Sequence, residues 1–214
     1  MDVTAPGSPR PTALEPPVAG SRVFLRPILT QDYELILAAE MSAQTISSYR
    51  NRGATPSPAE FAVRLWQGVL AQFLACRSDN AEPIAVVTAY GADFRNGHAY
   101  LAHMMFPKFA GKGWPQEGIE LFISYLFKTF SFRKLYGETN SALSTAFGSV
   151  GRGVFREEAR LVGHEVIDGQ YVDKIIYAVY ANDWESRRQK SGERSKLAER
   201  VRQAAGGDAT RSDL

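Results

Sequence analysis

The sequence predicts an α/β (α+β) fold in which a mixed, mostly antiparallel sheet of seven strands is flanked by helices. Apolar residues alternate between β-rich segments and helical spacing, in the order strand, two helices, three strands, helix, strand, helix and hairpin. The pairs Asn96-Gly97 and Asp168-Gly169 are hairpin turn signals between β-rich segments. A glycine loop over residues 108–115 precedes the longest predicted helix.

The first elements follow a leader, residues 1–20, which contains five prolines together with Gly, Ser and Ala and is therefore expected to be disordered. Residues 21–27 are predicted to be extended as far as Pro27. Thr30 is a candidate N-cap for a helix that runs to about Met41, with acidic residues in its first turn.

A polar loop over residues 49–58 separates this helix from a second one. Ser57 and Glu60 match a capping box, with proline at the first helical position. The second helix presents Phe61 and Leu65 on one face, and its apolar spacing extends to Val69 and to Leu70 or Phe73. The strands predicted after it cover residues 70–76, 83–90 and 98–106.

The later elements begin with a long helix over residues 115–130. A short strand at 134–139 and a weak helix at 144–151 precede the hairpin strands. The hairpin strands are predicted at 160–167 and 171–180, and the polar segment that follows is expected to be helical or disordered. The predicted domain therefore covers residues 21–185, with a basic tail over residues 186–214.

Composition excludes several classes of protein. Residues 186–205 carry seven basic and two acidic side chains, whereas residues 1–185 carry 17 basic and 19 acidic ones. A nucleic-acid-binding face on the domain is therefore not expected. No membrane span, signal peptide or metal site is expected, and the single cysteine, Cys76, is consistent with a cytoplasmic protein.

The glycine loop has the chemistry of an anion site. Gly111 and Gly113 leave main-chain N–H groups open to a ligand, the following helix start adds a positive dipole, and Lys112 adds a full charge. Such a loop suits a pyrophosphate. A solvent-exposed turn that caps the helix would have the same sequence, and both readings stay open.

Several sequence segments, taken together with their order and spacing, resemble the GNAT acetyltransferases over residues 22–185. The branch of that family that they resemble most acetylates ribosomal-protein N-termini. The segments are residues 23–27 with Asp32, 110–117 with 119–127, 133–136, Asn140 with Ser144, and 161–173 with Tyr177 and Trp184. The resemblance implies that acetyl-CoA or another acyl-CoA donates its acyl group to a primary amine, by direct attack in a ternary complex. The amine would belong to a small molecule, a peptide or a protein N-terminus, and the chain could form a homodimer.

The resemblance also assigns the donor site. Pantetheine would pair with the main chain of Met104, Met105 and Phe106. Asn140 would hydrogen-bond the pantetheine amide or would only shape a turn, and Ser144 would position or protonate the thiolate. The pyrophosphate loop would comprise Ala110, Gly111, Lys112, Gly113, Trp114 and Pro115.

The loop departs from the family pattern at two of these positions. The family usually has Arg or Gln where this chain has Ala110, and Gly or Ala where it has Pro115, which lacks an N–H donor. The segment Gly153-Val-Phe155 has one residue more than the usual Gly-Phe. A degenerate loop leaves an alternative open: a carrier-protein thioester as donor, or a non-catalytic binding or regulatory module.

Three residues are candidates for catalysis, because amine acylation needs a base and a group that reprotonates the thiolate. His103, just before the point where strands are expected to separate, could act as the base, or could be a packed strand histidine. Glu138 could face the amine, or be a surface residue. Ser144 could serve the thiolate, or be a helix N-cap.

Overall fold

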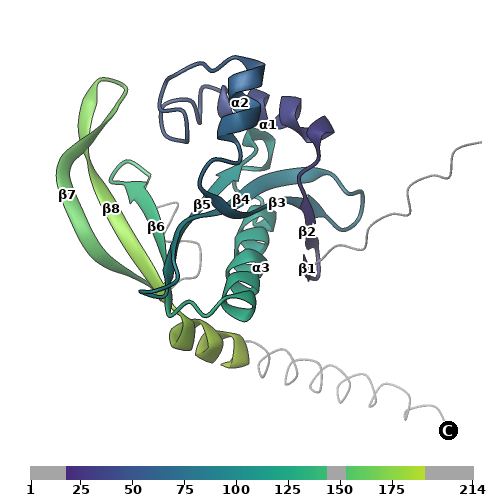
Figure 1. Ribbon diagram of the computed structural model, residues 1–214, viewed down its shortest axis with the longest axis vertical. Helices are drawn as coiled ribbons and strands as arrows, with labels where there is room; N and C mark the ends of the chain where they lie inside the picture. Colours follow the sequence, from purple (N-terminus) through teal and green to yellow (C-terminus); the bar gives the residue numbers. More distant parts are fainter. Residues whose placement is uncertain (1–17, 144–152, 191–214) are drawn as a thin grey trace, which may run out of the picture.

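One twisted sheet with helices on both faces makes up the computed structural model, which describes residues 18–143 and 153–190 (Figure 1). The strands hydrogen-bond in the order β1-β2-β3-β4-β5-β6-β8-β7. Their bounds are β1 Val18–Ala19, β2 Val23–Pro27, β3 Val69–Arg77, β4 Pro83–Asp93, β5 His98–Met105, β6 Lys134–Asn140, β7 Phe155–Ile167 and β8 Gln170–Tyr180. The helices are α1 Tyr33–Glu40, α2 Pro58–Arg64 and α3 Trp114–Thr129, with 3-10 turns η1 Thr30–Asp32 and η2 Pro107–Phe109. Residues 181–190 are also helical.

The predicted fold class is confirmed, and the described sheet has eight strands where seven were expected. The additional strand, β1, lies inside the segment assigned to a disordered leader, so that assignment is wrong for its last residues. Val18 and Ala19 pair antiparallel with Leu25 and Phe24, and the Gly20 N–H donates to the Val23 carbonyl at 2.8 Å. Main-chain pairing of two residues leaves no signal in a sequence. The helix expected over residues 144–151 lies outside the described residues.

The second helix is shorter than its apolar spacing suggested. The capping box is confirmed, because Ser57 Oγ accepts from the Glu60 N–H while Glu60 accepts from the Ser57 N–H. The helix ends at Arg64, and Gly68, with φ of +68°, turns the chain into β3. Val69 and Phe73 therefore belong to a strand. The N-cap expected at Thr30 is also wrong, since Thr30 opens the 3-10 turn η1.

Helix α3 covers one face of the sheet, and α1 and α2 lie over the other (Figure 1). Phe73 of β3 points toward α3, where its ring packs on Phe122 and Tyr125 at centroid distances of 6.0 and 5.2 Å. Its neighbour Gln72 points the opposite way and donates to the Leu65 carbonyl just after α2, at 3.2 Å. Strand alternation therefore sorts every sheet side chain into an α3 face and an α1–α2 face.

The start of α3 lies unusually close to the sheet. A Cβ placed on Gly118 would come within 2.8 Å of the Ala75 Cβ on β3, closer than two such atoms can approach. The pair Gly118 and Ala75 thus sets the height of the helix start above the sheet. That height matters because the glycine loop is attached to this end of α3.

Strands β5 and β6 separate part-way along their length. They pair in parallel only from His98–Lys134 to Leu101–Gly137. Beyond these pairs β5 stays with β4, while β6 stays with β8. The long β7–β8 hairpin leans away from the rest of the sheet on the β6 side (Figure 1). A gap therefore opens in the main-chain pairing beside residues 102–105 of β5.

Candidate active site

The glycine loop is open to solvent at the start of α3. Ala110, Gly111, Lys112 and Gly113 are all exposed. Both glycines have φ of +74°, a conformation that side-chain-bearing residues rarely adopt. Gly113 is the N-cap of α3 and carries no side chain that could cap the first turn. The first N–H groups of α3 are therefore available to an anion.

Pro115 is the second residue of α3 and is buried, so the first turn offers N–H groups from Trp114 and Gln116 but not from the residue between them. The side chain of Trp114 is partly exposed and has the Arg77 guanidinium stacked on its ring, 4.2 Å from the centroid. The Lys112 ammonium lies 6.0 Å from the same ring. The loop therefore combines positive charge with a reduced set of main-chain donors.

The main chain of β5 beside the gap has a fixed direction. The Phe106 N–H donates to the Ile84 carbonyl at 2.9 Å, so the groups of Phe106, and by alternation those of Met104, are used by β4. The groups of His103 and Met105 point to the other side, where β6 has separated. Of residues 104–106, where pantetheine was expected to pair, Met105 therefore faces the gap together with His103, whereas the N–H groups of Met104 and Phe106 face β4.

The His103 side chain faces α3 and lies two residues beyond the last paired residue of β5, not before the separation as expected. Its Nε2 is buried and has no hydrogen-bond partner among the described residues. Desolvation lowers the pKa of His103 to about 4. The imidazole is therefore neutral at physiological pH and a weak proton acceptor.

Glu138 lies on the opposite face, one residue beyond the last β5–β6 pair. Its carboxylate forms an ion pair with Lys174 of β8 at 2.9 Å. Asn140, two residues further along β6, is buried; its Oδ1 accepts from the Leu143 N–H at 3.1 Å and its Nδ2 donates to Glu165 at 3.4 Å. Asn140 therefore shapes the turn that follows β6. Ser144, the remaining candidate, lies outside the described residues.

Tyr90 marks where several polar side chains converge on the α1–α2 face. Burial raises the pKa of Tyr90, and the charge of Glu138 raises it further, while Arg52 lowers it. The Tyr90 ring lies 5.6 Å from that of Tyr100, which lies 5.1 Å from that of Tyr136 on β6. Sequence reasoning missed this group. The Asn96-Gly97 turn signal would have placed Tyr90 opposite His103, because the register shift between Tyr90 and Asp93 that brings it opposite Tyr100 has no signal in the sequence. Nothing in the sequence brings Arg52 to them.

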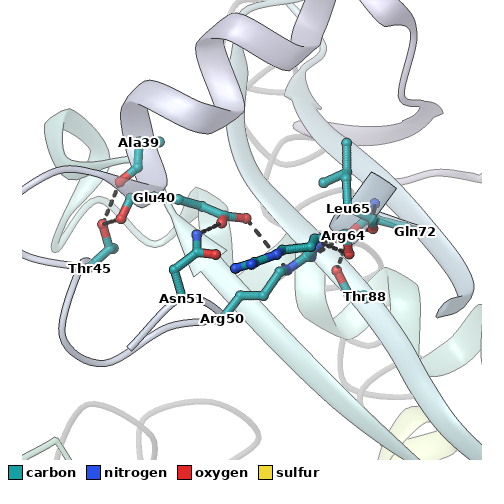
Figure 2. Close-up of polar contacts among 9 residues, drawn as sticks. All are labelled: Ala39, Glu40, Thr45, Arg50, Asn51, Arg64, Leu65, Gln72 and Thr88. Atoms are coloured by element: carbon teal, nitrogen blue, oxygen red, sulfur yellow. Dashed lines mark hydrogen bonds and ion pairs between the residues drawn. The ribbon is translucent and has the colours of Figure 1, made fainter. Parts of the chain in front are cut away.

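The loop that carries Arg52 is held by a buried polar network (Figure 2). Arg50 Nε lies 3.6 Å from the Glu40 carboxylate at the end of α1, while its other nitrogens donate to the Leu65 carbonyl and to Gln72, both at 2.8 Å. Asn51 donates to Glu40 at 2.6 Å. Burial raises the pKa of Glu40, and the charge of Arg50 and the hydrogen bond from Asn51 partly offset this increase. One arginine thus ties the loop to α1, to the end of α2 and to β3.

No family model and no curated protein sequence matches this chain. Solved structures do. A spermidine N-acetyltransferase from Vibrio cholerae, in complex with CoA and spermine, superposes with a TM-score of 0.67 at 18% identity, covering 77% of this chain and 99% of that one. An acetyltransferase of the GNAT family from Bacillus anthracis gives 0.63 at 12% identity, covering 76% and 97%. The chain has the GNAT fold.

The GNAT fold is what these likenesses show, and the expected fold is thereby confirmed. The narrower resemblance, to the branch that acetylates ribosomal-protein N-termini, stays a prediction. A further structure of the Vibrio cholerae enzyme, with a TM-score of 0.66 at 19% identity, contains manganese ions. In residues 18–143 and 153–190 of this chain, no three His, Cys, Asp or Glu side chains are grouped so as to hold a metal. None of the helices described here has the length and apolar character to cross a bilayer.

Proposed function

We propose that this protein is an N-acyltransferase that moves an acetyl or other acyl group from acyl-CoA to a primary amine. The observation that carries the proposal is the gap between β5 and β6, which has an exposed glycine loop and an uncapped helix start at one end. Main-chain groups of His103 and Met105 face the gap and can hold an extended thioester arm. A solved structure with the same fold is in complex with CoA, which supports an acyl-CoA donor.

The reaction needs no covalent enzyme intermediate. The amine nitrogen attacks the thioester carbonyl, a C–N bond forms, and the C–S bond then breaks as the thiolate leaves. A main-chain N–H beside the gap stabilises the carbonyl oxyanion. Glu138 accepts the proton that the nitrogen loses on attack, because it faces the acceptor side, whereas His103 faces α3 and binds a proton weakly. The thiolate takes a proton from water as CoA departs, and Glu138 releases its proton to solvent.

A second candidate function rests on Pro115 and Ala110. The proline removes one donor from the helix start, and alanine supplies no charge at the loop entrance. A donor with fewer phosphate contacts, such as a carrier-protein thioester, would tolerate both changes. A non-catalytic binding module would tolerate them as well.

Calorimetry with acetyl-CoA tests the donor site. We expect binding to the wild type, and Lys112→Glu should weaken it roughly tenfold, because it replaces an attraction to the pyrophosphate with a repulsion. Lys128→Glu, a matched charge reversal on an exposed residue in the last turn of α3, should leave the affinity unchanged. Absence of binding at millimolar acetyl-CoA would contradict the acyl-CoA proposal. Binding of an acylated carrier protein under those conditions would favour the second candidate.

A further inference from the structure

The segment just before β2 is hydrogen-bonded to the first turn of α3. Glu117 Oε1 accepts from Ser21 Oγ at 3.1 Å and from the Arg22 main-chain N–H at 2.9 Å, and Glu117 Oε2 accepts from Arg22 Nε at 2.9 Å. One carboxylate therefore receives three hydrogen bonds from residues that lie 95 and 96 positions earlier in the chain. We call residues 20–22 together with Glu117 the N-terminal clamp.

The N-terminal clamp is also closely packed. A Cβ placed on Gly20 would lie 2.7 Å from Glu117 Oε1 and 3.0 Å from Leu121 Cδ1, so the main chain rests directly on the helix. The Gly20 N–H donates to the Val23 carbonyl at 2.8 Å, which ties the same segment to the start of β2. The segment therefore connects α3 to the edge of the sheet.

Glu117 lies close to the end of the glycine loop. It is the fourth residue of α3, and its N–H donates to the carbonyl of the N-cap, Gly113, at 3.4 Å. The loop begins after Phe109, which is buried, and residues 110–113 between these two ends are exposed. A displacement of Glu117 would therefore move Gly113 and the first N–H groups of α3, which are the groups available to an anion.

The N-terminal clamp also compensates a negative charge beside the anion site. An unpaired carboxylate in the first turn would compete with a bound pyrophosphate for the positive end of the helix and would repel it. Burial alone would raise the pKa of Glu117, but the hydrogen bonds from Arg22 and Ser21 and the charge of Arg22 lower it. The carboxylate therefore stays ionised, bonded and paired with a cation.

We propose that Glu117 is a positioning residue for the acyl donor, and that residues 20–22 hold the phosphate-binding end of the donor site in place. This inference rests on the proposed donor site. Glu117 acts through Gly113 and the start of the helix, and not through contact with the donor. Support for the glycine loop thus comes from a segment that is far from it in sequence.

Two measurements on the same variants test the inference. Glu117→Ala removes all three hydrogen bonds, so amide hydrogen exchange at residues 117–119, which close the first turn, should become about tenfold faster. Acetyl-CoA binding, measured by calorimetry, should weaken by about five- to tenfold in this variant. Glu117→Gln keeps an oxygen that can accept from Ser21 and from the Arg22 N–H, so its affinity should stay within about twofold of the wild type.

Glu120→Ala is the matched control. Glu120 lies about one turn further along α3 and also pairs with an arginine from a distant segment, Arg187, at 2.9 Å. Its removal should change neither the exchange at residues 117–119 nor the affinity for acetyl-CoA. If Glu117→Ala does not fold, Arg22→Ala takes its place, because that side chain is 58% exposed. Loss of one hydrogen bond and of the compensating charge should weaken acetyl-CoA binding by about threefold.

Three results would overturn the inference: equal acetyl-CoA affinity in the wild type and Glu117→Ala, equal weakening in Glu120→Ala, or no recovery in Glu117→Gln. Inorganic pyrophosphate, titrated as a second probe, separates the inference from the proposed function. If the wild type binds pyrophosphate but not acetyl-CoA, the acyl-CoA donor is refuted. The inference then stands if Glu117→Ala weakens pyrophosphate binding, and falls if it does not. Failure of the wild type to bind either probe would refute both.

Discussion

His103 should make the stability of the protein depend on pH. Its pKa is lowered by burial from 6.5 to about 4, so between these values the unfolded chain binds a proton that the folded chain does not. The stability contributed by the neutral imidazole is therefore complete above pH 6.5 and is lost as the pH falls toward 4. His103→Phe should remove this dependence and reduce the loss of unfolding free energy between pH 7 and pH 5 by about 1–2 kcal/mol.

Urea denaturation at the two pH values measures the effect. At pH 7 the variant should be at least as stable as the wild type, because phenylalanine removes a buried nitrogen that has no partner in the described part of the chain. His164→Asn, at an exposed position of β7, should keep the wild-type pH dependence. Loss of acyl transfer in a folded His103→Phe protein would contradict the assignment of the base to Glu138.

The candidate residues show which parts of a site can be predicted from sequence. His103, Glu138 and the glycines were found because each stands next to a recognisable boundary, the end of a strand or the start of a helix. Tyr90, Arg52 and Lys174 were not, since each lies in a separate element and they meet only when the sheet forms. The direction in which a strand residue points also depends on register, so the sequence did not show which main-chain groups of residues 104–106 face the gap.

Helix α3 depends on the absence of a side chain at Gly118. Gly118→Ala would place a Cβ 2.8 Å from that of Ala75, and both atoms are attached to backbone, so the helix start must move. Overpacking costs about 1–3 kcal/mol, and the higher helix propensity of alanine returns about 1 kcal/mol. We expect a net loss of roughly 1 kcal/mol in unfolding free energy and weaker acetyl-CoA binding, because the glycine loop moves with the helix.

A double-mutant cycle checks this prediction. Ala75→Gly should make room for the new methyl group, so the double variant should be more stable than the sum of the single effects predicts, by at least about 0.5 kcal/mol. Strict additivity would show that the contact does not set the position of the helix.

Helix α3 also illustrates what local pattern can provide. Its length and its buried residues Ile119, Phe122, Ile123 and Leu126 follow from periodicity and are confirmed. The early end of α2 was missed because helical spacing of apolar residues continued across Gly68 into β3. Periodicity alone does not reveal a turn inside such a pattern. The tight approach at Gly118 depends on a partner far away in sequence, which no local pattern reports.

At the scale of the whole molecule, the helix that follows β8, residues 181–190, packs against α3. Trp184 is 3% exposed, and its Nε1 donates to Ser124 Oγ of α3 at 3.1 Å, while Arg187 pairs with Glu120 at 2.9 Å. Trp184→Ala should lower the unfolding free energy by about 3–4 kcal/mol, as loss of a buried aromatic side chain does. Trp66→Ala, at a residue 42% exposed, should cost clearly less. Equal effects in chemical denaturation would mean that the 181–190 helix is not part of the cooperative unit.

At this level the order of elements was predictable and their arrangement was not. Hairpin turns and helix caps are local chemistry, so the succession of strands and helices could be read off the chain. The insertion of β8 between β6 and β7, and the separation of β5 from β6, follow from contacts between distant segments.

The gap beside β5 has a consequence for how such proteins change over time. The groups that face it belong to the peptide backbone of His103 and Met105, and every amino acid except proline carries the same N–H and C=O. Selection for a ligand held in this way constrains the path of the chain far more than the identity of its residues. Sequences can then diverge until sequence comparison detects no similarity, while the backbone conformation and its hydrogen bonds to the ligand are retained.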